Sequence, residues 1–221
     1  TTPVVLVACL MSSHAFSGSF SVGVQDTDYR PTFRGDLPSY SGFAREFLDT
    51  FAAKYGHTFT YRPFPSVNLY DEFAVKKTLD FKFPDNPNWS KDVKKDVNIV
   101  YSAGVLAVKQ GVMVLPANKG KGLANITKMV TLRGFTPFPY MDQISSKKIE
   151  VMEVNYAGAA INIVASDRVD GAYMGVMAAN YVMSETLNKA GMLVFDDSLP
   201  YATADFSLSS IAHPEVIKQM N

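Results

Sequence analysis

The chain has 221 residues, of which 47% are hydrophobic, so it is long enough to bury a core of its own in one or two domains. Its 21 basic and 21 acidic residues give a formal net charge of zero, which excludes a global attraction to nucleic acid or to an anionic membrane. One cysteine excludes an internal disulfide, and the three histidines are too far apart in sequence for a zinc motif.

Residues 1–18 differ from the rest of the chain. An uncharged apolar run, TTPVVLVACLM, is followed by the small residues of SSHAFSG, and this order is typical of the remnant of a secretory signal peptide. Cleavage after Ala15 or Ser17 would leave a mature protein starting near Gly18. Two alternatives stay open: LVAC also fits a lipobox that would place a lipid on Cys9, and the run could be a buried strand. The ordinary signal peptide and the lipobox predict export to the periplasm, and the buried strand permits it.

The stretch FSVGVQDTDYRP, residues 20–31, predicts a strand that delivers polar side chains to a loop. Apolar and polar residues alternate with a period of two, and the run ends in the cluster Asp26-Thr27-Asp28 before Tyr29. Ligands in α/β proteins sit outside the carboxyl ends of strands. The loop is therefore either part of a ligand site or an ordinary solvated turn.

A helix and a second strand follow. Phe43, Phe47, Phe51 and Tyr55 recur at helical spacing, and Gly56 is a natural C-terminal stop. Residues 57–62 alternate again, so the opening of the chain predicts a β-loop-α-β unit, which makes a parallel sheet.

The rest of the chain alternates between short strands and helices. Residues 105–115 are interrupted by Lys109-Gln110-Gly111 and predict two strands with a crossing between them. Ser90 and Asn155 are expected to cap helices, and Asp170 to orient the end of a strand. Tyr140 and Tyr173 are expected to be core or lobe-surface aromatics, and Met174, Met177 and Met183 to lie in a helical core, whereas Trp89, in a proline-rich loop, could line the cleft. The other predicted strands are 79–83, 128–132, 149–154, 169–173, 191–195 and 206–211, and the other predicted helices are 68–77, 91–97, 156–165, 176–187 and one from Pro214.

This order predicts an α/β protein of two lobes, each a mixed or parallel sheet flanked by helices, joined by two hinge crossings. The expected lobe 1 comprises residues 19–105 and 196–221, and the expected lobe 2 comprises residues 106–195. Closure of two such lobes around a ligand is a common form of conformational change. A single larger sheet is the alternative.

Several of these stretches together resemble the family 3 extracellular solute-binding proteins, which are the amino-acid-type periplasmic receptors of ABC transporters. The stretches are GVQDTDYRP, the helix opening at Ser41-Gly42-Phe43, Val100-Tyr101-Ser102, residues 168–173, and the terminal FSLSSIAHPEVIKQMN. The resemblance covers about residues 19–221. It implies two α/β lobes with a ligand closed between them, a transporter permease or a membrane sensor as partner, and a monomer that needs no cofactor.

The resemblance also implies a set of binding residues. Tyr29 corresponds to the aromatic residue that stacks on the ligand, and Asp26 to the polar residue beside it. Lys95 stands where the family has the arginine that grips a carboxylate, and Ser90 stands at its hydroxyl position. Lysine is a point charge without the planar fork of arginine, so this exchange is not conservative. In lobe 2, the family's Gly-Thr turn corresponds to the stretch of Arg133, Gly134, Phe135 and Thr136, in which Arg133 could replace the missing guanidinium.

One departure from the family concerns the ligand itself. Gly175 stands where amino-acid binders carry the aspartate that holds the ligand's ammonium group, and no carboxylate lies between Asp170 and Glu185. An unpaired, desolvated ammonium costs several kcal/mol. The expected ligand is therefore a small anionic or neutral organic molecule, and a standard α-amino acid is disfavoured.

Two other functions stay open. The first is a degenerate pair of lobes that binds a partner protein and no ligand. The second is an enzyme on the same scaffold, similar to cyclohexadienyl dehydratases, in which Asp26, Asp28 and Lys95 would do acid–base work. No G-x-S-x-G motif is present, which argues against a serine hydrolase. The expectation is a binding protein without enzymatic activity, bound metal or nucleic acid.

Overall fold

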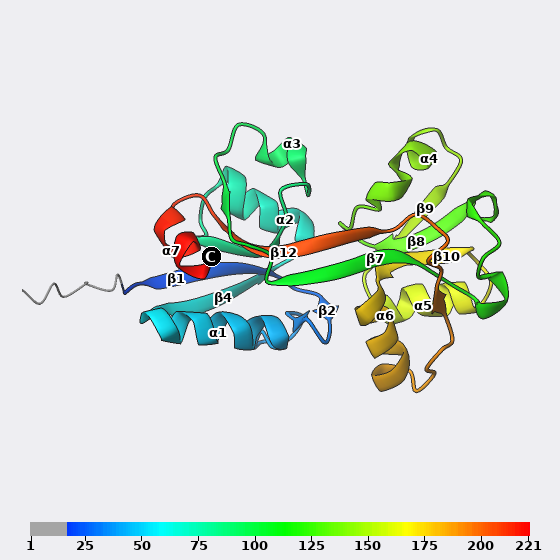
Figure 1. The fold of residues 1–221 in the computed structure, drawn as a ribbon, viewed down its shortest axis with the longest axis horizontal. Coiled ribbons are helices and arrows are strands. Elements are labelled where there is room, and N and C mark those ends of the chain that lie inside the picture. The colour runs from blue at the N-terminus through cyan, green and yellow to red at the C-terminus, as the bar shows by residue number, and fades with distance from the viewer. Residues whose placement is uncertain (1–16) are drawn as a thin grey trace, which may run out of the picture.

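The structure, a computed structural model, describes residues 17–221. The predicted signal peptide, apart from its last two residues, and the possible lipid site at Cys9 lie outside the described residues. The chain forms two lobes connected by two long strands, as Figure 1 shows. This arrangement confirms the predicted two-lobed α/β architecture.

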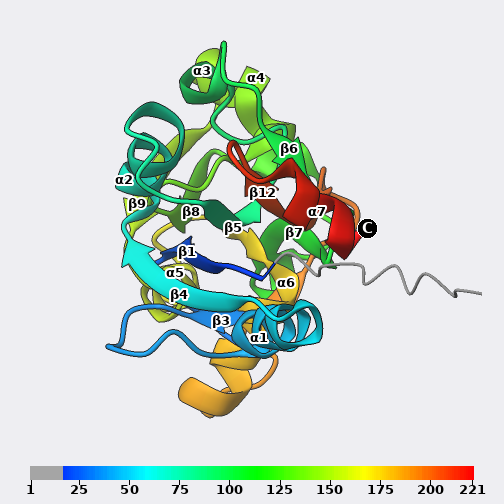
Figure 2. The ribbon, with the colours of Figure 1, turned by 90° about the vertical axis from the view of Figure 1, so that its left-hand side faces the viewer.

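The first lobe is built on parallel strands. β1 (Ser19–Gln25) lies between β4 (Thr58–Phe64) and β5 (Phe81–Asp85) and is parallel to both. Helix α1 (Phe43–Tyr55) connects β1 to β4, so the predicted β-loop-α-β unit is confirmed. Figure 2 shows α1 on one side of these strands and α2 and α3 on the other.

Helix α1 begins and ends at the expected residues, and only part of its aromatic stripe is buried. Gly56 caps its C-terminus in the left-handed conformation, at φ 73°. The buried side chains are Ala44, Leu48, Phe51 and Ala52, whereas Phe43 is 43% exposed. The aromatic stripe is thus only partly in the core, because the small residues of the neighbouring stripe let the helix approach the sheet.

Two antiparallel strands, β7 (Leu106–Val114) and β12 (Ala202–Ser210), connect the lobes. The prediction of two strands within residues 105–115 is wrong, because the chain runs straight through Gly111. Its upstream half pairs with β12 and its downstream half with β10. Phe195 and Tyr201 pack over Gly111, where a Cβ would lie 3.1 Å from Tyr201 Cβ. The glycine therefore serves close packing and makes no turn.

The second lobe repeats the parallel arrangement. β8 (Lys128–Leu132) lies between β9 (Glu150–Val154) and β10 (Gly171–Gly175), parallel to both. The full strand order, β4-β1-β5-β12-β7-β10-β8-β9, crosses both lobes. The remaining elements of this lobe are α4 (Met141–Ser145), α5 (Ala157–Ala165), α6 (Val176–Tyr181), β11 (Val194–Phe195), the π-helix Val182–Thr186 and the 3-10 turns Pro116–Asn118, Leu123–Asn125 and Phe138–Tyr140.

The first lobe is completed by short elements around its sheet. They are the hairpin β2 (Asp28–Tyr29) and β3 (Phe33–Arg34), α2 (Ser66–Tyr70), the π-helix Asp71–Val75, α3 (Lys91–Lys94), β6 (Val100–Tyr101) and α7 (Pro214–Met220). Both expected side-chain caps are wrong. Ser90 precedes α3 in a left-handed conformation, and α5 begins after Tyr156, one residue beyond Asn155. Neither helix has a side-chain cap bond.

The core predictions are confirmed with one exception. Tyr140 and Tyr173 are buried and in ring contact at 5.8 Å, and Met174 and Met183 are buried as well. Met177 is 40% exposed, because it lies on the outer face of α6. Within residues 17–221, helices long and apolar enough to cross a bilayer are absent.

Asp170 ties the start of β8 to β10, as its predicted role at a strand end requires. Its carboxylate accepts hydrogen bonds from the backbone N–H groups of Thr127 and Lys128, at 2.7 and 2.8 Å, and from the Thr127 hydroxyl at 3.0 Å.

We expect Asp170→Ala to lower the free energy of unfolding by about 1–2 kcal/mol, measured by urea denaturation. Asp197→Ala removes an exposed carboxylate paired only with Lys119 and should change it by less than about 0.5 kcal/mol. Equal effects of the two variants would contradict the role of Asp170.

Candidate functional site

An aromatic pocket lies where the two lobes meet. Lobe 1 and the connecting strands contribute most of its walls, and the turn after β8 closes it from lobe 2. Its volume is about 40 Å³, room for roughly three water molecules. The residues that line this inner pocket are Gln25, Tyr29, Phe33, Tyr70, Pro84, Trp89, Ser90, Gln110, Gly134, Phe135, Thr136 and Phe206.

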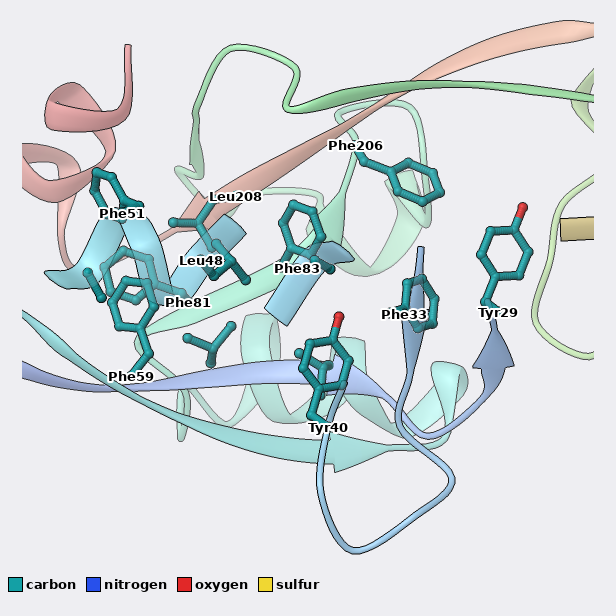
Figure 3. Packing of buried hydrophobic residues seen from close by; sticks show 14 of the residues in the cluster. Tyr29, Phe33, Tyr40, Leu48, Phe51, Phe59, Phe81, Phe83, Phe206 and Leu208 are labelled. Carbon is teal, nitrogen blue, oxygen red and sulfur yellow. The ribbon is translucent and has the colours of Figure 1, made fainter. Parts of the chain in front are cut away.

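Tyr29 is the residue that brings the lobes together. Its ring is 1% exposed and packs against Phe33 of its own hairpin at 5.2 Å, against Phe135 of lobe 2 at 5.6 Å, and against Phe206 of β12 at 6.4 Å. Figure 3 shows Tyr29 and Phe206 at the edge of the lobe 1 core, away from Phe59 and Phe81. The aromatic core of lobe 1 therefore continues through Tyr29 to the surface of lobe 2.

The Tyr29 hydroxyl takes the space beside Gly175. A Cβ at Gly175 would overlap this hydroxyl and lie 2.9 Å from Tyr29 Cζ. Burial raises the pKa of Tyr29, and the neighbouring Gln110 side chain and Gly175 backbone oppose this only weakly. The phenol therefore stays neutral and occupies the position that a side chain at residue 175 would fill.

A second, larger hollow lies on the outer side of Tyr29. It has a volume of about 390 Å³, and both lobes line it, with polar side chains from the β1–β2 loop facing residues that follow β8 and β9. Burial and the nearby Asp36 carboxylate raise the pKa of Asp26. Asp28 is also partly buried, but the hydrogen bonds and charge of Arg30 hold its pKa below the usual value. The residues that line this outer hollow are Asp26, Thr27, Asp28, Asp36, Pro65, Ser66, Val67, Arg133, Asn155 and Tyr156.

The site residues expected from the sequence are distributed between the inner pocket and the outer hollow, except for one. Tyr29, Ser90, Gly134, Phe135 and Thr136 line the inner pocket. Asp26 and Arg133 line the outer hollow, where Arg133 lies 3.9 Å from Glu153. Lys95 is exposed at the end of α3 and lines neither compartment. The binding roles of all these residues stay predictions.

Sequence reasoning missed a buried charge cluster behind the inner pocket. Lys82 and Asp85 are fully buried, and the side chain of Lys94 is 6% exposed. Each lysine nitrogen lies 3.5 Å from Asp85 Oδ1. The other Asp85 oxygen accepts a 2.7 Å hydrogen bond from Ser209. The cluster thus joins β5, α3 and β12 and holds two ammonium groups against one carboxylate.

Aromatic rings separate the cluster from the pocket. Lys82 Nζ lies 4.1 Å from the centre of the Tyr70 ring and 5.9 Å from that of Trp89, and both rings line the pocket. Tyr70 also donates a 3.0 Å hydrogen bond to Asp85. Burial lowers the pKa of Lys82 to about 8 and also lowers that of Lys94. Within residues 17–221, clusters of three or more histidine, cysteine or acidic side chains that could hold a metal ion are absent.

Comparisons with known proteins show the fold. No family model and no curated protein matches the sequence. Three similar solved structures are an arginine transport system periplasmic binding protein from Legionella pneumophila (14% identity, TM-score 0.70), a histidine-bound ABC uptake transporter substrate-binding protein from Streptococcus pneumoniae (20%, 0.67), and the VFT2 domain of Bordetella pertussis BvgS (15%, 0.70). In the same order, the matches cover 92%, 92% and 96% of this chain. They cover 90%, 84% and 87% of the three neighbouring chains. The chain therefore has the two-lobed fold of periplasmic binding proteins.

The buried lysine predicts a pH dependence of stability. Because the pKa of Lys82 falls from 10.5 to about 8 on folding, the unfolded chain binds a proton between these values that the native chain has released. The free energy of unfolding should therefore rise from pH 8 to about pH 10, by up to about 1.4 kcal/mol per pH unit. Urea denaturation at several pH values measures this slope, which Lys82→Met should reduce. An unchanged slope in the variant would show that Lys82 is not its source.

The close contact at Gly175 predicts a steric effect. Gly175→Ala should lower the free energy of unfolding by about 1–3 kcal/mol, because the new methyl group overlaps Tyr29. Gly158→Ala is the control, since its Cβ would meet only Val182, at 3.9 Å. Adding Tyr29→Phe should recover part of the loss by removing the hydroxyl. A Gly175→Ala protein as stable as the control would contradict this packing.

Proposed function

We propose that this chain is a solute-binding protein of the family 3 type, which closes its two lobes over a small organic molecule in the inner pocket. The observation that carries the proposal is the origin of the pocket walls. Trp89 and Ser90 come from lobe 1, Phe135 and Thr136 come from lobe 2, and Gln110 comes from a connecting strand. Bending β7 and β12 would open this pocket, and ligand binding would favour the closed state.

The setting of this function follows from the fold and stays part of the proposal. Similar structures belong to periplasmic transport proteins and to a periplasmic domain of BvgS. We therefore place the protein in the periplasm, where a signal peptide would direct it, and assign it a transporter permease or a membrane sensor as partner. We also propose that the lobes meet at the boundaries 105/106 and 195/196. The proposed function of the protein is binding and not catalysis.

The walls of the inner pocket argue against a standard α-amino acid. Among the described residues that line it, none is acidic, so a ligand ammonium group would lack an anionic partner there. Gly175 supplies no carboxylate, and Tyr29 fills the space in front of it. The solved neighbours that bind arginine or histidine share the fold, and the proposed ligand differs from theirs.

A second candidate is a partner-binding module that takes no ligand. The small volume of the inner pocket, about 40 Å³, favours it, because the lobes already contact each other through Tyr29 and Phe135. A solute would have to separate these two rings before it could enter.

A ligand screen distinguishes the two functions. Trp89 is the single tryptophan of the chain and lines the pocket, so its fluorescence reports binding directly. We expect at least one compound in a library of carboxylates, amino acids, sugars and polyols to change this fluorescence and to raise the melting temperature, since it binds only the native state. A library without a stabilising compound would overturn the solute-binding proposal and favour the partner-binding module.

A matched pair of variants tests the position of the site. Phe135→Ala removes a ring from the pocket wall and should weaken binding by about 1–3 kcal/mol, whereas Phe138→Ala truncates a half-exposed phenylalanine three residues along the chain and should leave affinity unchanged. Calorimetric titration of both variants measures this difference. Equal affinities would place the ligand elsewhere.

A further inference from the structure

The charge cluster behind the inner pocket contains one more cation than anion. Among residues 17–221, Asp85 is the only acidic side chain in an ion pair with Lys82 or Lys94. Its lone pairs are already engaged by hydrogen bonds from Tyr70, Ser209 and the Asn86 backbone, at 3.0, 2.7 and 2.8 Å. The carboxylate is therefore shared among five donors, and the second ammonium group has no anion of its own.

Backbone carbonyl groups and aromatic rings around the two lysines stabilise their ammonium groups. Lys82 donates a 2.6 Å hydrogen bond to the Pro84 carbonyl, and Lys94 donates one of the same length to the Asn86 carbonyl. The rings of Tyr70 and Trp89 face Lys82, and those of Tyr70 and Tyr101 face Lys94. These contacts hold the ammonium groups in place but bring no negative charge, so a buried positive potential extends through the pocket wall.

The lining of the pocket suits a flat apolar body, which would occupy the space opened when the Tyr29 and Phe135 rings separate, because the closed pocket has a volume of only about 40 Å³. Six aromatic rings line it, and its neutral polar groups are limited to two glutamines, a serine and a threonine, together with the phenol groups of the tyrosines. Gln25 and Gln110 are buried and can donate hydrogen bonds to oxygen atoms of a ligand. Stacked rings suit a planar molecule, and the positive wall suits an anion at its end.

We propose that the inner pocket binds a small carboxylate with a flat, unsaturated or aromatic body and no ammonium group, and that the ligand's charge compensates the unmatched lysine of the Lys82–Asp85–Lys94 cluster. This inference rests on the proposed solute-binding function and adds to it the chemical class of the ligand. The cluster would then attract the anion electrostatically, without contacting it, because the rings of Tyr70 and Trp89 lie between the lysines and the ligand.

Pairs of acids and amides test the class of ligand. Benzoate, 4-hydroxybenzoate and cinnamate are compared with benzamide, 4-hydroxybenzamide and cinnamamide, which have the same shapes without the charge, and with L-phenylalanine, which adds an ammonium group. We expect at least one acid to bind at least tenfold more tightly than its amide and than L-phenylalanine, measured by calorimetric titration and by melting temperature. Amides that bind as tightly as their acids would overturn the inference.

Variants test the role of the cluster. Lys94→Met leaves Lys82 and Asp85 as a neutral pair, so the preference for acid over amide should fall below threefold, whereas Lys94→Arg keeps the charge and the preference. Lys77→Met is the matched control, because Lys77 lies exposed on the same lobe and outside the cluster, and its loss should leave the preference above fivefold. A Lys94→Met protein that still prefers the acid tenfold would overturn the role of the cluster.

Proton uptake is an independent measurement on the unmodified protein. The titratable groups that face Lys82 and Lys94 are Asp85, Tyr70, Tyr101 and Lys91. An anion should raise the pKa of Lys82 from about 8, so binding at pH 8.5 should take up part of a proton. Titrations in two buffers of different ionisation enthalpy measure this uptake. Acid binding without proton uptake would overturn the compensation by Lys82.

The failures can be distinguished from one another. Binding of another solute class, such as a sugar or an amino acid, with no response to any flat acid would leave the solute-binding function in place and overturn the inference about its ligand. A chain that responds to no compound in the broad library would overturn both.

Discussion

The seating of Tyr29 against Gly175 is the constraint on which the rest of the site depends. One aromatic side chain from the first lobe fills the space beside the second, and Phe33, Phe135 and Phe206 surround it. Tyr29 lines the small inner pocket, and its sequence neighbour Asp28 lines the larger outer hollow. The contact pairs a neutral phenol with a glycine. One pair of residues therefore holds the two lobes in contact beside the pocket.

The buried lysines show a second consequence of close packing. An ammonium group loses its hydration when it is buried, and this cost is tolerated only where opposite charge and hydrogen bonds replace the water. Around Lys82 and Lys94, two carbonyl groups, three aromatic rings and one shared carboxylate do so in part. The pKa of Lys82 is lowered because these groups do not fully replace the hydration that the ammonium group loses on burial. In a binding protein, such a deficit is a source of ligand preference, because a ligand that supplies the charge stabilises the closed state.

Much of the fold could be predicted from local patterns. The strand at 128–132 and the helix at 43–55 have the predicted boundaries, because their periodicity and flanking residues act over a few positions. The break predicted at Gly111 failed because the continuity of β7 depends on its partners β10 and β12, which are distant in sequence. Within the candidate site, Tyr29 and Phe135, which the resemblance implied as ligand-binding residues, line the inner pocket, whereas Lys95 lies outside the pocket on the exposed end of α3. Their binding roles stay predictions.

The sequence by itself indicated the alternating strands and helices of an α/β protein and determined the absence of an acidic residue at position 175, because both follow from the order and identity of residues. It left open whether the strands form two lobes or one larger sheet. Only the tertiary structure decided where the charges lie. In the strand FKFPD, alternation places Lys82 on the face opposite Phe81 and Phe83, where a solvent-exposed position is the simplest expectation. Tyr70 and Trp89 cover that face, and Asp85 and Lys94 meet Lys82 beneath them. Burial depends on what packs against a strand from elsewhere in the chain, and no local pattern contains that information.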